Sequence, residues 1–394
     1  MSIPASQQHL FKLDWVRNPA LLAEQQNVTG ITSQYTAEIA AWCVELHQQL
    51  QELARDMGLQ LLLMSGNGAA LRMDLTSLRG SADNDYLTSA SPQDVQALLD
   101  ALAHRFSGMP DGLLQPQRIP KPDGAEELPL LAYRVGVPKL FDPNPTIDAL
   151  TVKLEFHLDD ELPPSDTITV AHGVVGQSPT ARVPQLPYQV ALKLLALVEP
   201  PVGIDADREP AIARQIYDID VLLAAMLQPA DWDALSTYAP HRYAKEIAQR
   251  SLPSAQDEPW SGARWRLQEW SACIDGNTRF WHHINAMQSS QLARSSQRTP
   301  EEWAARCHRL IVATHCLRDA KPHEPWQRAL SIEALIPPKP HGPELRALRR
   351  AVRRVAKAPV GHPRAGFWAA LAQTEDSRDL LAELDALDRA LADI

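Results

Sequence analysis

The sequence predicts an α+β fold in the first half of the chain and an all-helical second half. Segments of strand length, with apolar runs or alternating apolar and polar residues, occur before about residue 186. From residue 187 onward, apolar residues recur at helical spacing instead. The 32 prolines gather between such segments, so we interpret these stretches as loops. At 394 residues the chain is too long for one ordinary core, which predicts two or three domains.

The elements of the first half follow from periodicity and from helix signals. Gly58 ends a helix with regularly spaced apolar positions, and Ser91 followed by Pro92 begins another. The short apolar or alternating runs between them have the length of strands. The expected order is a helix at 37–57, a strand at 60–65, a short helix at 69–75, a strand at 83–88, a helix at 92–106, and strands at 130–137, 149–158 and 168–173.

The second half is predicted to contain helices alone, with a proline-containing loop at 199–210 between the first two. The expected helices are 187–198, 209–227, 241–251, 261–274, 300–318, 343–357 and 376–392. We therefore divide the chain into an N-terminal helical segment at 1–59, an α+β domain at 60–186 and a helical domain at 187–394.

Composition narrows the class of protein. Apolar residues make up 45% and charged residues 22%, which is typical of globular proteins and argues against large-scale disorder. The net charge of −10 does not exclude nucleic-acid binding, because a local basic patch would suffice. Four cysteines without a C-x-x-C pair, no signal-peptide pattern and no apolar run of ~18 residues predict a cytoplasmic protein without membrane spans.

A glycine-rich turn follows the predicted strand at 60–65. It reads Ser65-Gly66-Asn67-Gly68, and its free backbone N–H groups, with the N-terminus of the next helix, suit a phosphate. Most such turns bind nothing, so the prediction depends on the neighbouring segment. That segment is Arg79-Gly80-Ser81-Ala82-Asp83-Asn84-Asp85.

Carboxylates follow this turn in a pattern that favours a metal site. Asp83 and Asp85 are two residues apart on a predicted strand, so alternation places both on one face. A divalent cation is the commonest reason to hold two like charges together. Glu155, on the same strand face as Lys153, is the candidate third ligand of a two-Mg²⁺ or two-Mn²⁺ site. Taken alone, Lys153 and Glu155 would be interpreted as a solvated face of an edge strand.

These motifs together resemble those of the AbiE-type (AbiEii-like) nucleotidyltransferase toxins, within the DNA polymerase β-like nucleotidyltransferase superfamily. The family's first motif is similar to Gly68-Ala69-Ala70-Leu71-Arg72 followed by residues 79–85, at the same separation. The later motifs correspond to Lys153-Leu154-Glu155, to Lys193 on a helix, and to Arg214-Gln215-Ile216-Tyr217-Asp218-Ile219. The resemblance covers roughly residues 60–225 and implies a mixed-sheet nucleotidyltransferase domain.

The chain departs from the family pattern at several positions. Gly66 and Asn67 stand at the positions of the family's lysine and first glycine, and Ala69 replaces its threonine. Asn84 occupies a usually apolar position, from which we expect the far face of this strand to be less buried than in relatives. Glu155 replaces the commoner aspartate. No departure removes a metal ligand.

The resemblance implies a role for each matching residue. Asp83, Asp85 and Glu155 would bind metal, with Glu155 near the acceptor hydroxyl as a general base. Lys193 would reach the triphosphate, and Asp218 would bind the nucleotide or anchor Lys193. The simpler explanation of Lys193 and Asp218 is an interhelical salt bridge. The expected nucleotide-binding residues are Ser65, Gly66, Gly68, Arg79, Ser81, Lys153 and Arg214. Arg79 could instead brace its loop, and Arg214 could instead form a surface or interhelical ion pair.

The implied reaction moves a nucleoside monophosphate from an NTP to an acceptor, with RNA and in particular the 3′ end of tRNA as the expected acceptor. Such a toxin would be countered by a separately encoded antitoxin, in a toxin–antitoxin or phage-defence system. A small molecule or a protein side chain is the alternative acceptor. A non-catalytic nucleotide-binding interaction protein is the alternative of another class, which Asn67 and Ala69 would favour.

A basic stripe marks the predicted helix at 343–357 and suits a nucleic-acid backbone. A solvated face paired with the acidic C-terminal segment explains the stripe equally well. The stripe consists of Arg346, Arg349, Arg350, Arg353, Arg354 and Lys357.

Overall fold

The computed structural model describes most of the chain and divides it into two compact units. Unit 1 contains Met1–Gln185 together with Gln288–Gln297, and unit 2 contains Leu186–Met287 and Arg298–Ile394. The described residues are 3, 6–16, 18–74, 77–121, 128–140, 149–169, 179–200, 202–205, 208–252, 259–318, 321–336, 363–374 and 377–392. The basic segment 343–357 lies outside these residues.

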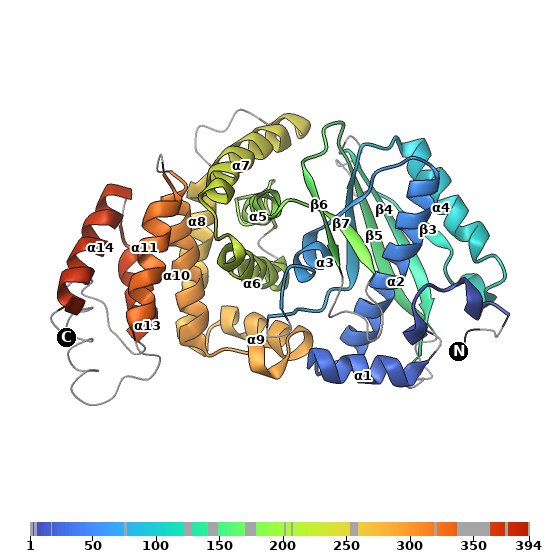
Figure 1. The fold of residues 1–394 in the computed structure, drawn as a ribbon, viewed down its shortest axis with the longest axis horizontal. Helices are drawn as coiled ribbons and strands as arrows, with labels where there is room; N and C mark the ends of the chain where they lie inside the picture. Colours follow the sequence, from blue (N-terminus) through green and yellow to red (C-terminus); the bar gives the residue numbers. More distant parts are fainter. Residues whose placement is uncertain are drawn as a thin grey trace. The chain divides into compact units, whose positions relative to one another are not determined.

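Unit 1 is built on a mixed five-stranded sheet with the order β1-β2-β5-β4-β3 (Figure 1). β2 and β5 run parallel, and the other neighbours pair antiparallel. The bounds are β1 Leu62–Met64, β2 Asp83–Thr88, β3 Pro116–Ile119, β4 Leu130–Pro138 and β5 Ala149–Leu158. A separate antiparallel pair is formed by β6 Ser165–Thr169 and β7 Thr180–Pro184. The predicted mixture of strands and helices in the first half is confirmed.

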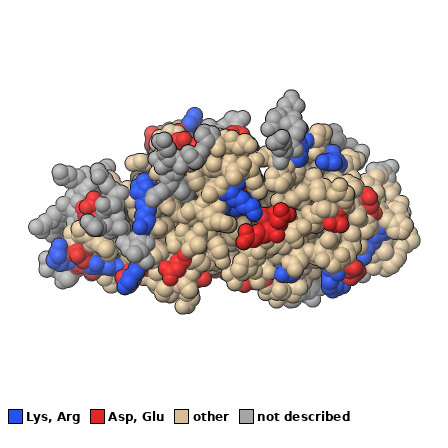
Figure 2. All heavy atoms as spheres, turned by 90° about the horizontal axis from the view of Figure 1, so that it is seen from above, with Lys and Arg blue, Asp and Glu red and all other residues tan. Residues whose placement is uncertain are grey.

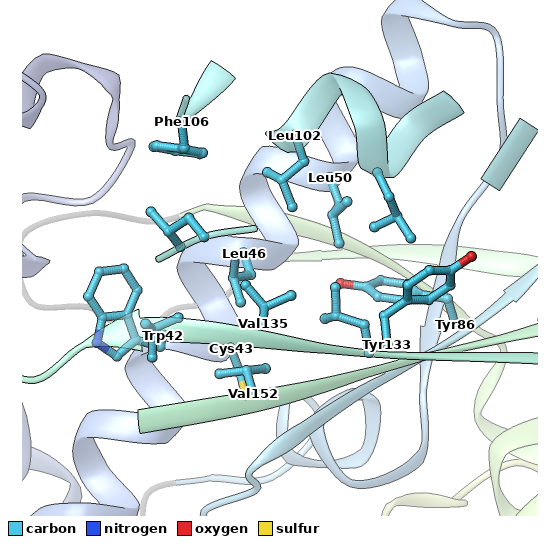
Figure 3. Close-up of a cluster of buried hydrophobic side chains, with 14 of the residues drawn as sticks. Trp42, Cys43, Leu46, Leu50, Tyr86, Leu102, Phe106, Tyr133, Val135 and Val152 are labelled. Carbon is cyan, nitrogen blue, oxygen red and sulfur yellow. The ribbon is translucent and has the colours of Figure 1, made fainter. Parts of the chain in front are cut away.

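Two helices, α2 (Gln34–Asp56) and α4 (Pro92–Arg105), pack on one face of this sheet and enclose the core of unit 1. Both begin as local chemistry predicts, because the Ser33 and Ser91 side chains accept hydrogen bonds from free N–H groups of the first turn. Figure 3 shows apolar side chains of α2, α4 and the strands meeting in this layer. They include Trp42, Leu46 and Leu50 of α2, Leu102 of α4, Phe106, Tyr86, Tyr133, Val135 and Val152.

Alternation along β2 and β5 separates a core face from a polar face. Asn84 and Tyr86 of β2 face α2, where Asn84 donates to the Cys43 carbonyl and the Tyr86 ring stacks on His47. Asp83 and Asp85 therefore lie on the opposite face. On β5 the core residues Val152, Leu154 and Phe156 are fully buried and alternate with Lys153 and Glu155.

The short helix α3 (Ser65–Ala70) differs from the prediction of a helix at 69–75. β1 ends at Met64, and Ser65 has a left-handed backbone conformation, with φ of 57°. This one residue turns the chain directly from strand into helix, so the expected glycine loop is already helical. Other elements were not expected from the sequence: α1 Pro19–Thr29, β3, β7, α9 Arg279–Gln291, α11 His323–Leu335 and α13 Pro363–Leu371.

Unit 2 consists of helices in the part of the chain that the structure describes, as the sequence predicts. α10 (Pro300–Cys316) is its central element and packs against α6, α8, α11 and α13. Tryptophans fill the core around it, and Trp232, Trp303, Trp326 and Trp368 are fully buried. The remaining helices are α5 Leu186–Leu195, α6 Glu209–Ala225, α7 Pro229–Gln249, α8 Pro259–Trp270 and α14 Ser377–Ala392.

Residues 288–297 belong to unit 1, although the chain on either side of them belongs to unit 2. Two isolated β-bridges, Ile31 with Ala293 and Arg79 with Leu292, attach this segment to unit 1. The Gly80 N–H donates to the Gln291 carbonyl at 3.0 Å. Among the described helices, none combines the length and apolar character that crossing a membrane requires.

Candidate active site

The strand-to-helix turn at Ser65 is tightly packed against the loop that precedes β2. A Cβ atom added at Gly66 would lie 2.5 Å from Ser81 Oγ and 2.9 Å from Arg79 Nη2. Such distances are well inside van der Waals contact, so a side chain at this position would displace the Ser81 hydroxyl and the Arg79 guanidinium. Gly66 thus holds the turn and the segment 79–81 together. The structure places Gly66 in a packing role.

The predicted carboxylates come together on the polar face of the sheet. β2 and β5 pair in parallel so that Asp83 lies opposite Lys153 and Asp85 lies opposite Glu155. The Ser81 hydroxyl donates to Asp83 Oδ1 at 2.8 Å, and Lys153 Nζ is 2.6 Å from Glu155 Oε1. Alternation and strand pairing therefore bring three acidic residues and one lysine to the same place.

Asp85 is the most strongly perturbed member of this group. Its side chain is buried, and burial raises the pKa of its carboxyl well above the usual value. The charges of Asp83 and Glu155 raise it further, while a hydrogen bond with the Ser65 side chain lowers it. Asp85 Oδ1 is buried and has no hydrogen-bond partner among the described residues. An unpartnered oxygen between like charges is the environment that a divalent cation relieves.

The carboxylates are not arranged as a closed metal site. No three His, Cys, Asp or Glu side chains of the described residues converge on one point at ligand distance. Glu155 is turned toward Lys153, and Asp83 accepts from Ser81. The donor set nevertheless fits Mg²⁺, which prefers carboxylate oxygens and retains several waters. The ion pair engages Glu155 Oε1, so a cation bound by all three residues would compete with Lys153 for this carboxylate.

A hydrogen bond joins Asn67 and Asn84, two of the positions where the chain departs from the family pattern. Asn67 Nδ2 donates to Asn84 Oδ1 at 2.8 Å and to the Asp83 carbonyl at 2.6 Å. Asn84 Nδ2 in turn donates to the Cys43 carbonyl at 2.8 Å. The expectation that Asn84 marks a less buried strand face is wrong, since Asn84 is fully buried. Its amide is accommodated because α3 and α2 supply the partners.

Arg79 braces its loop, which is one of the two roles considered for it. The side chain is buried, and Nη1 donates to the Gly80 carbonyl at 3.0 Å and to Gln291 Oε1 at 3.3 Å. The second acceptor belongs to the 288–297 segment of unit 1. Arg79 therefore connects the loop before β2 to the returning part of the chain.

The other two motif positions lie in unit 2. Lys193 of α5 and Asp218 of α6 form a buried ion pair, with 2.7 Å between Lys193 Nζ and Asp218 Oδ2. This ion pair is what both sequence interpretations predict, namely Asp218 anchoring a nucleotide-binding Lys193 and a purely structural interhelical salt bridge. Arg214 lies one turn before Asp218 on α6 and is half-buried.

Arg72 is a contact residue that sequence reasoning did not single out, although it ends the first motif. Arg72 Nη2 is 2.7 Å from Asp166 Oδ2 on β6 and also donates to the Pro184 carbonyl at 2.7 Å. It thereby ties the region after α3 to the β6–β7 pair. Its place in the motif could have marked Arg72 as a candidate. Its contacts could not be predicted, because the partners lie about a hundred residues away in the sequence.

Charged side chains of both signs are interspersed on the face of the molecule shown in Figure 2. The described atoms of this view form no extended field of one sign. The described residues on this face therefore offer no basic patch that could contact a nucleic-acid backbone in place of the stripe predicted at 343–357.

Comparison with protein families gives one match over the region that contains these motifs. The model of the family described as "Nucleotidyl transferase AbiEii toxin, Type IV TA system" matches residues 68–280, more than half of the chain. This span includes Asp83, Asp85, Glu155, Lys193 and Asp218. No curated protein matches the chain significantly.

Proposed function

Because the chain belongs to the AbiEii nucleotidyl transferase toxin family of type IV toxin–antitoxin systems, we propose that it transfers a nucleoside monophosphate from an NTP to an acceptor hydroxyl. The observation that supports this most strongly is Asp85. It is a buried carboxylate with an unpartnered oxygen, beside Asp83 and opposite Glu155. The same arrangement supports a requirement for Mg²⁺ or Mn²⁺.

In this proposal Asp83, Asp85 and Glu155 hold the divalent cations. Bound cations would neutralise phosphate charge and lower the pKa of the attacking hydroxyl. Ser65 and Ser81 orient the carboxylates of Asp85 and Asp83 through their hydroxyls. Glu155, once released from Lys153, accepts the proton of the acceptor hydroxyl.

Lys193 supplies a positive charge for the triphosphate in this proposal, and Asp218 keeps its ammonium in place. Lys153 becomes available to the nucleotide when its pairing with Glu155 opens. Arg214 is kept as a nucleotide-binding residue on the strength of its motif.

RNA is the acceptor we propose, with the 3′ end of tRNA first. Blocking this end would stop translation, which suits a toxin neutralised by a separately encoded antitoxin. The arginines of 343–357 are the proposed contact to the RNA backbone. Binding that depends on them should weaken steeply as salt rises, because it releases counterions from the RNA.

The test is a transfer assay with Mg²⁺, each α-labelled NTP in turn and total tRNA. Label on tRNA that disappears in the Asp83→Ala/Asp85→Ala variant is the expected result. Label on the protein itself, or on a small molecule in a cell extract, would replace the RNA acceptor by the corresponding alternative. NTP binding without any transfer would indicate a non-catalytic interaction protein, and no NTP binding at all would refute the active site.

Metal binding can be measured separately from transfer. In EDTA, Asp85→Asn should raise the melting temperature, because it removes a buried like charge. Adding Mg²⁺ at about 100 times Kd should stabilise the wild-type chain by about 2.7 kcal/mol and leave the variant almost unchanged. An equal response of both proteins to Mg²⁺ would exclude Asp85 as a ligand.

A further inference from the structure

Gln291, the last residue of α9, contacts the loop that precedes β2 with both its side chain and its backbone. Its Oε1 accepts a hydrogen bond from Arg79 Nη1 at 3.3 Å, and its carbonyl accepts one from the Gly80 N–H at 3.0 Å. The β-bridge between Arg79 and Leu292 continues this attachment by one residue. Two consecutive residues of the loop are thus held by one residue, which lies 212 positions after Arg79 in the sequence.

Arg79 connects this attachment to the turn at Gly66. Its side chain is 3% exposed, and its Nη1 also donates to the Gly80 carbonyl at 3.0 Å. Its Nη2 packs so closely against the turn that a Cβ atom added at Gly66 would lie 2.9 Å from it. A guanidinium is rigid and planar, so an acceptor at one nitrogen also fixes the direction of the others. The side chain of Gln291 therefore helps to set where Arg79 lies against the turn.

The loop leads from this attachment directly to the carboxylates. Ser81 follows Gly80, is buried, and donates from its hydroxyl to Asp83 Oδ1 at 2.8 Å. The Ser81 hydroxyl orients this carboxylate only while the backbone of the loop keeps its place. A catalytic group displaced by about 1 Å can lower a reaction rate about a hundredfold. Loosening of the loop should therefore affect catalysis more than it affects stability.

We propose that Gln291 is a positioning residue of the active site, which holds the loop 79–81 so that Ser81 presents Asp83 to a divalent cation. Its effect on transfer rests on the proposed function, whereas the order of the loop can be measured without it. Gln291 lies outside residues 68–280, so the match to the family does not extend to this residue.

Three variants of Gln291 and one control test this role. Gln291→Met keeps a side chain of similar length and removes the acceptor, whereas Gln291→Glu retains an acceptor for Arg79. Gln291→Asn withdraws the amide by one methylene, and replaces Gln291→Met if that variant does not fold. Thr32→Val is the matched control, because the Thr32 hydroxyl donates to the Ser289 carbonyl at 3.0 Å and so attaches the same segment at another point.

Hydrogen exchange of the amides of 79–83 measures the order of the loop in the full-length protein. We expect exchange to be about tenfold faster in Gln291→Met, because loss of a hydrogen bond to a charged group favours opening by roughly this factor. Gln291→Glu and Thr32→Val should exchange as the wild-type chain does. Unchanged exchange in Gln291→Met, or the same acceleration in Thr32→Val, would overturn the inference.

Transfer kinetics measure the consequence for the reaction. Gln291→Met should lower kcat about tenfold and raise the Mg²⁺ concentration that gives half the maximal rate, with the KM for NTP unchanged at saturating Mg²⁺. A merely structural role would lower the melting temperature and leave the rate of the folded protein unaltered. Full activity of Gln291→Met, or equal losses in Gln291→Met and Gln291→Glu, would refute the positioning role. Absence of transfer by the wild-type chain would reject the proposed function, and the exchange measurement would then decide alone whether Gln291 orders the loop.

Discussion

Asn67 and Asn84 show how a single buried amide depends on its partners. The buried Asn84 amide would be unfavourable without partners, yet its oxygen accepts from the half-buried Asn67 and its nitrogen donates to the Cys43 carbonyl, while Asn67 also donates to the Asp83 carbonyl. The strand that holds the carboxylates is thereby connected to α3 on one side and to α2 on the other. Removing one of the two side-chain amides leaves the other without one hydrogen-bond partner. Removing both amides leaves fewer unsatisfied hydrogen-bonding atoms.

This pairing predicts that the two positions are coupled in a double-mutant cycle. Asn67→Ala and Asn84→Val should each destabilise the chain, and the double variant should be more stable than the sum of the two by about 1–2 kcal/mol. The measurement is urea unfolding of the four proteins. Arg55→Ala is the control, because Arg55 is exposed and its ion pair with Asp56 lies at the surface, so its loss should cost less than about 0.5 kcal/mol. Additive changes in unfolding free energy at Asn67 and Asn84 would show that the hydrogen bond between their side chains does not contribute to stability.

The residues of the polar strand face follow from the sequence, but the asparagine pair does not. Side-chain alternation is fixed by strand geometry, so Asp83 and Asp85 are on one face wherever β2 is placed. Asn84 suggested an exposed strand face because it is polar at a usually apolar position. Its hydrogen-bond partners come from α2 and α3, and the sequence does not reveal contacts that depend on tertiary packing. The buried setting of Arg79 escaped prediction for the same reason, since its partner Gln291 is far along the chain.

Among the elements, α5 and α6 are held together by a buried charge pair. Lys193 and Asp218 have side-chain exposures of 5% and 0%. Burying two charges costs hydration, and a well-packed apolar pair is often as stable, so stability alone gives little reason for an ion pair here. We infer that the lysine is retained for its charge.

Paired variants separate a structural from a functional role for Lys193. Lys193→Met should destabilise unit 2 by about 3–5 kcal/mol, because it removes the ammonium that lies 2.7 Å from the buried Asp218 carboxylate. The Lys193→Met/Asp218→Leu double variant should recover most of that stability but remain inactive in the transfer assay. Thermal unfolding and label transfer are measured on the same preparations. Recovery of activity together with stability would make the pair purely structural and remove Lys193 from the nucleotide site.

Element prediction succeeded where a segment carries its own signal. The Asp83–Thr88 strand, the Ser91-capped helix and the long helix ending before Gly58 agree with the sequence pattern. The predicted bounds of α3 were wrong because the helix starts at Ser65, which has a left-handed backbone conformation. The sequence pattern does not predict this conformation for a serine. A helix was expected only from 241, yet α7 begins at Pro229 and continues through Pro240.

At the scale of the whole molecule, each unit contains a histidine that burial keeps neutral. Burial lowers the pKa of His47 in unit 1 to about 3 and that of His308 in unit 2 to about 4. In the unfolded chain both imidazoles take up a proton below about pH 6.5. The unfolded state therefore binds more protons in this range, and the native state loses stability as pH falls below 6.5 toward the folded pKa values.

This difference predicts acid sensitivity that two variants should reduce. His47→Gln and His308→Gln, neutral at every pH, should each lower the slope of unfolding free energy against pH by up to about 1.4 kcal/mol per pH unit between pH 6 and pH 5. Other titrating groups cancel when each variant is compared with the wild-type chain under urea unfolding. Parallel curves for variant and wild type would show that the histidine is not buried as a neutral group.

The position of residues 288–297 in the chain determines when unit 1 can be completed during synthesis. Unit 1 receives this segment only after the ribosome has passed roughly a hundred residues of unit 2, from Leu186 to Met287. At ~5–20 residues per second that interval lasts about 5–20 s. During it, Arg79 and Gly80 lack the partners that Gln291 provides, and the loop leading to Asp83 and Asp85 is not yet braced. A nascent toxin would thus stay incomplete until about three quarters of it had been translated, which gives the cell an interval before the completed enzyme must be restrained.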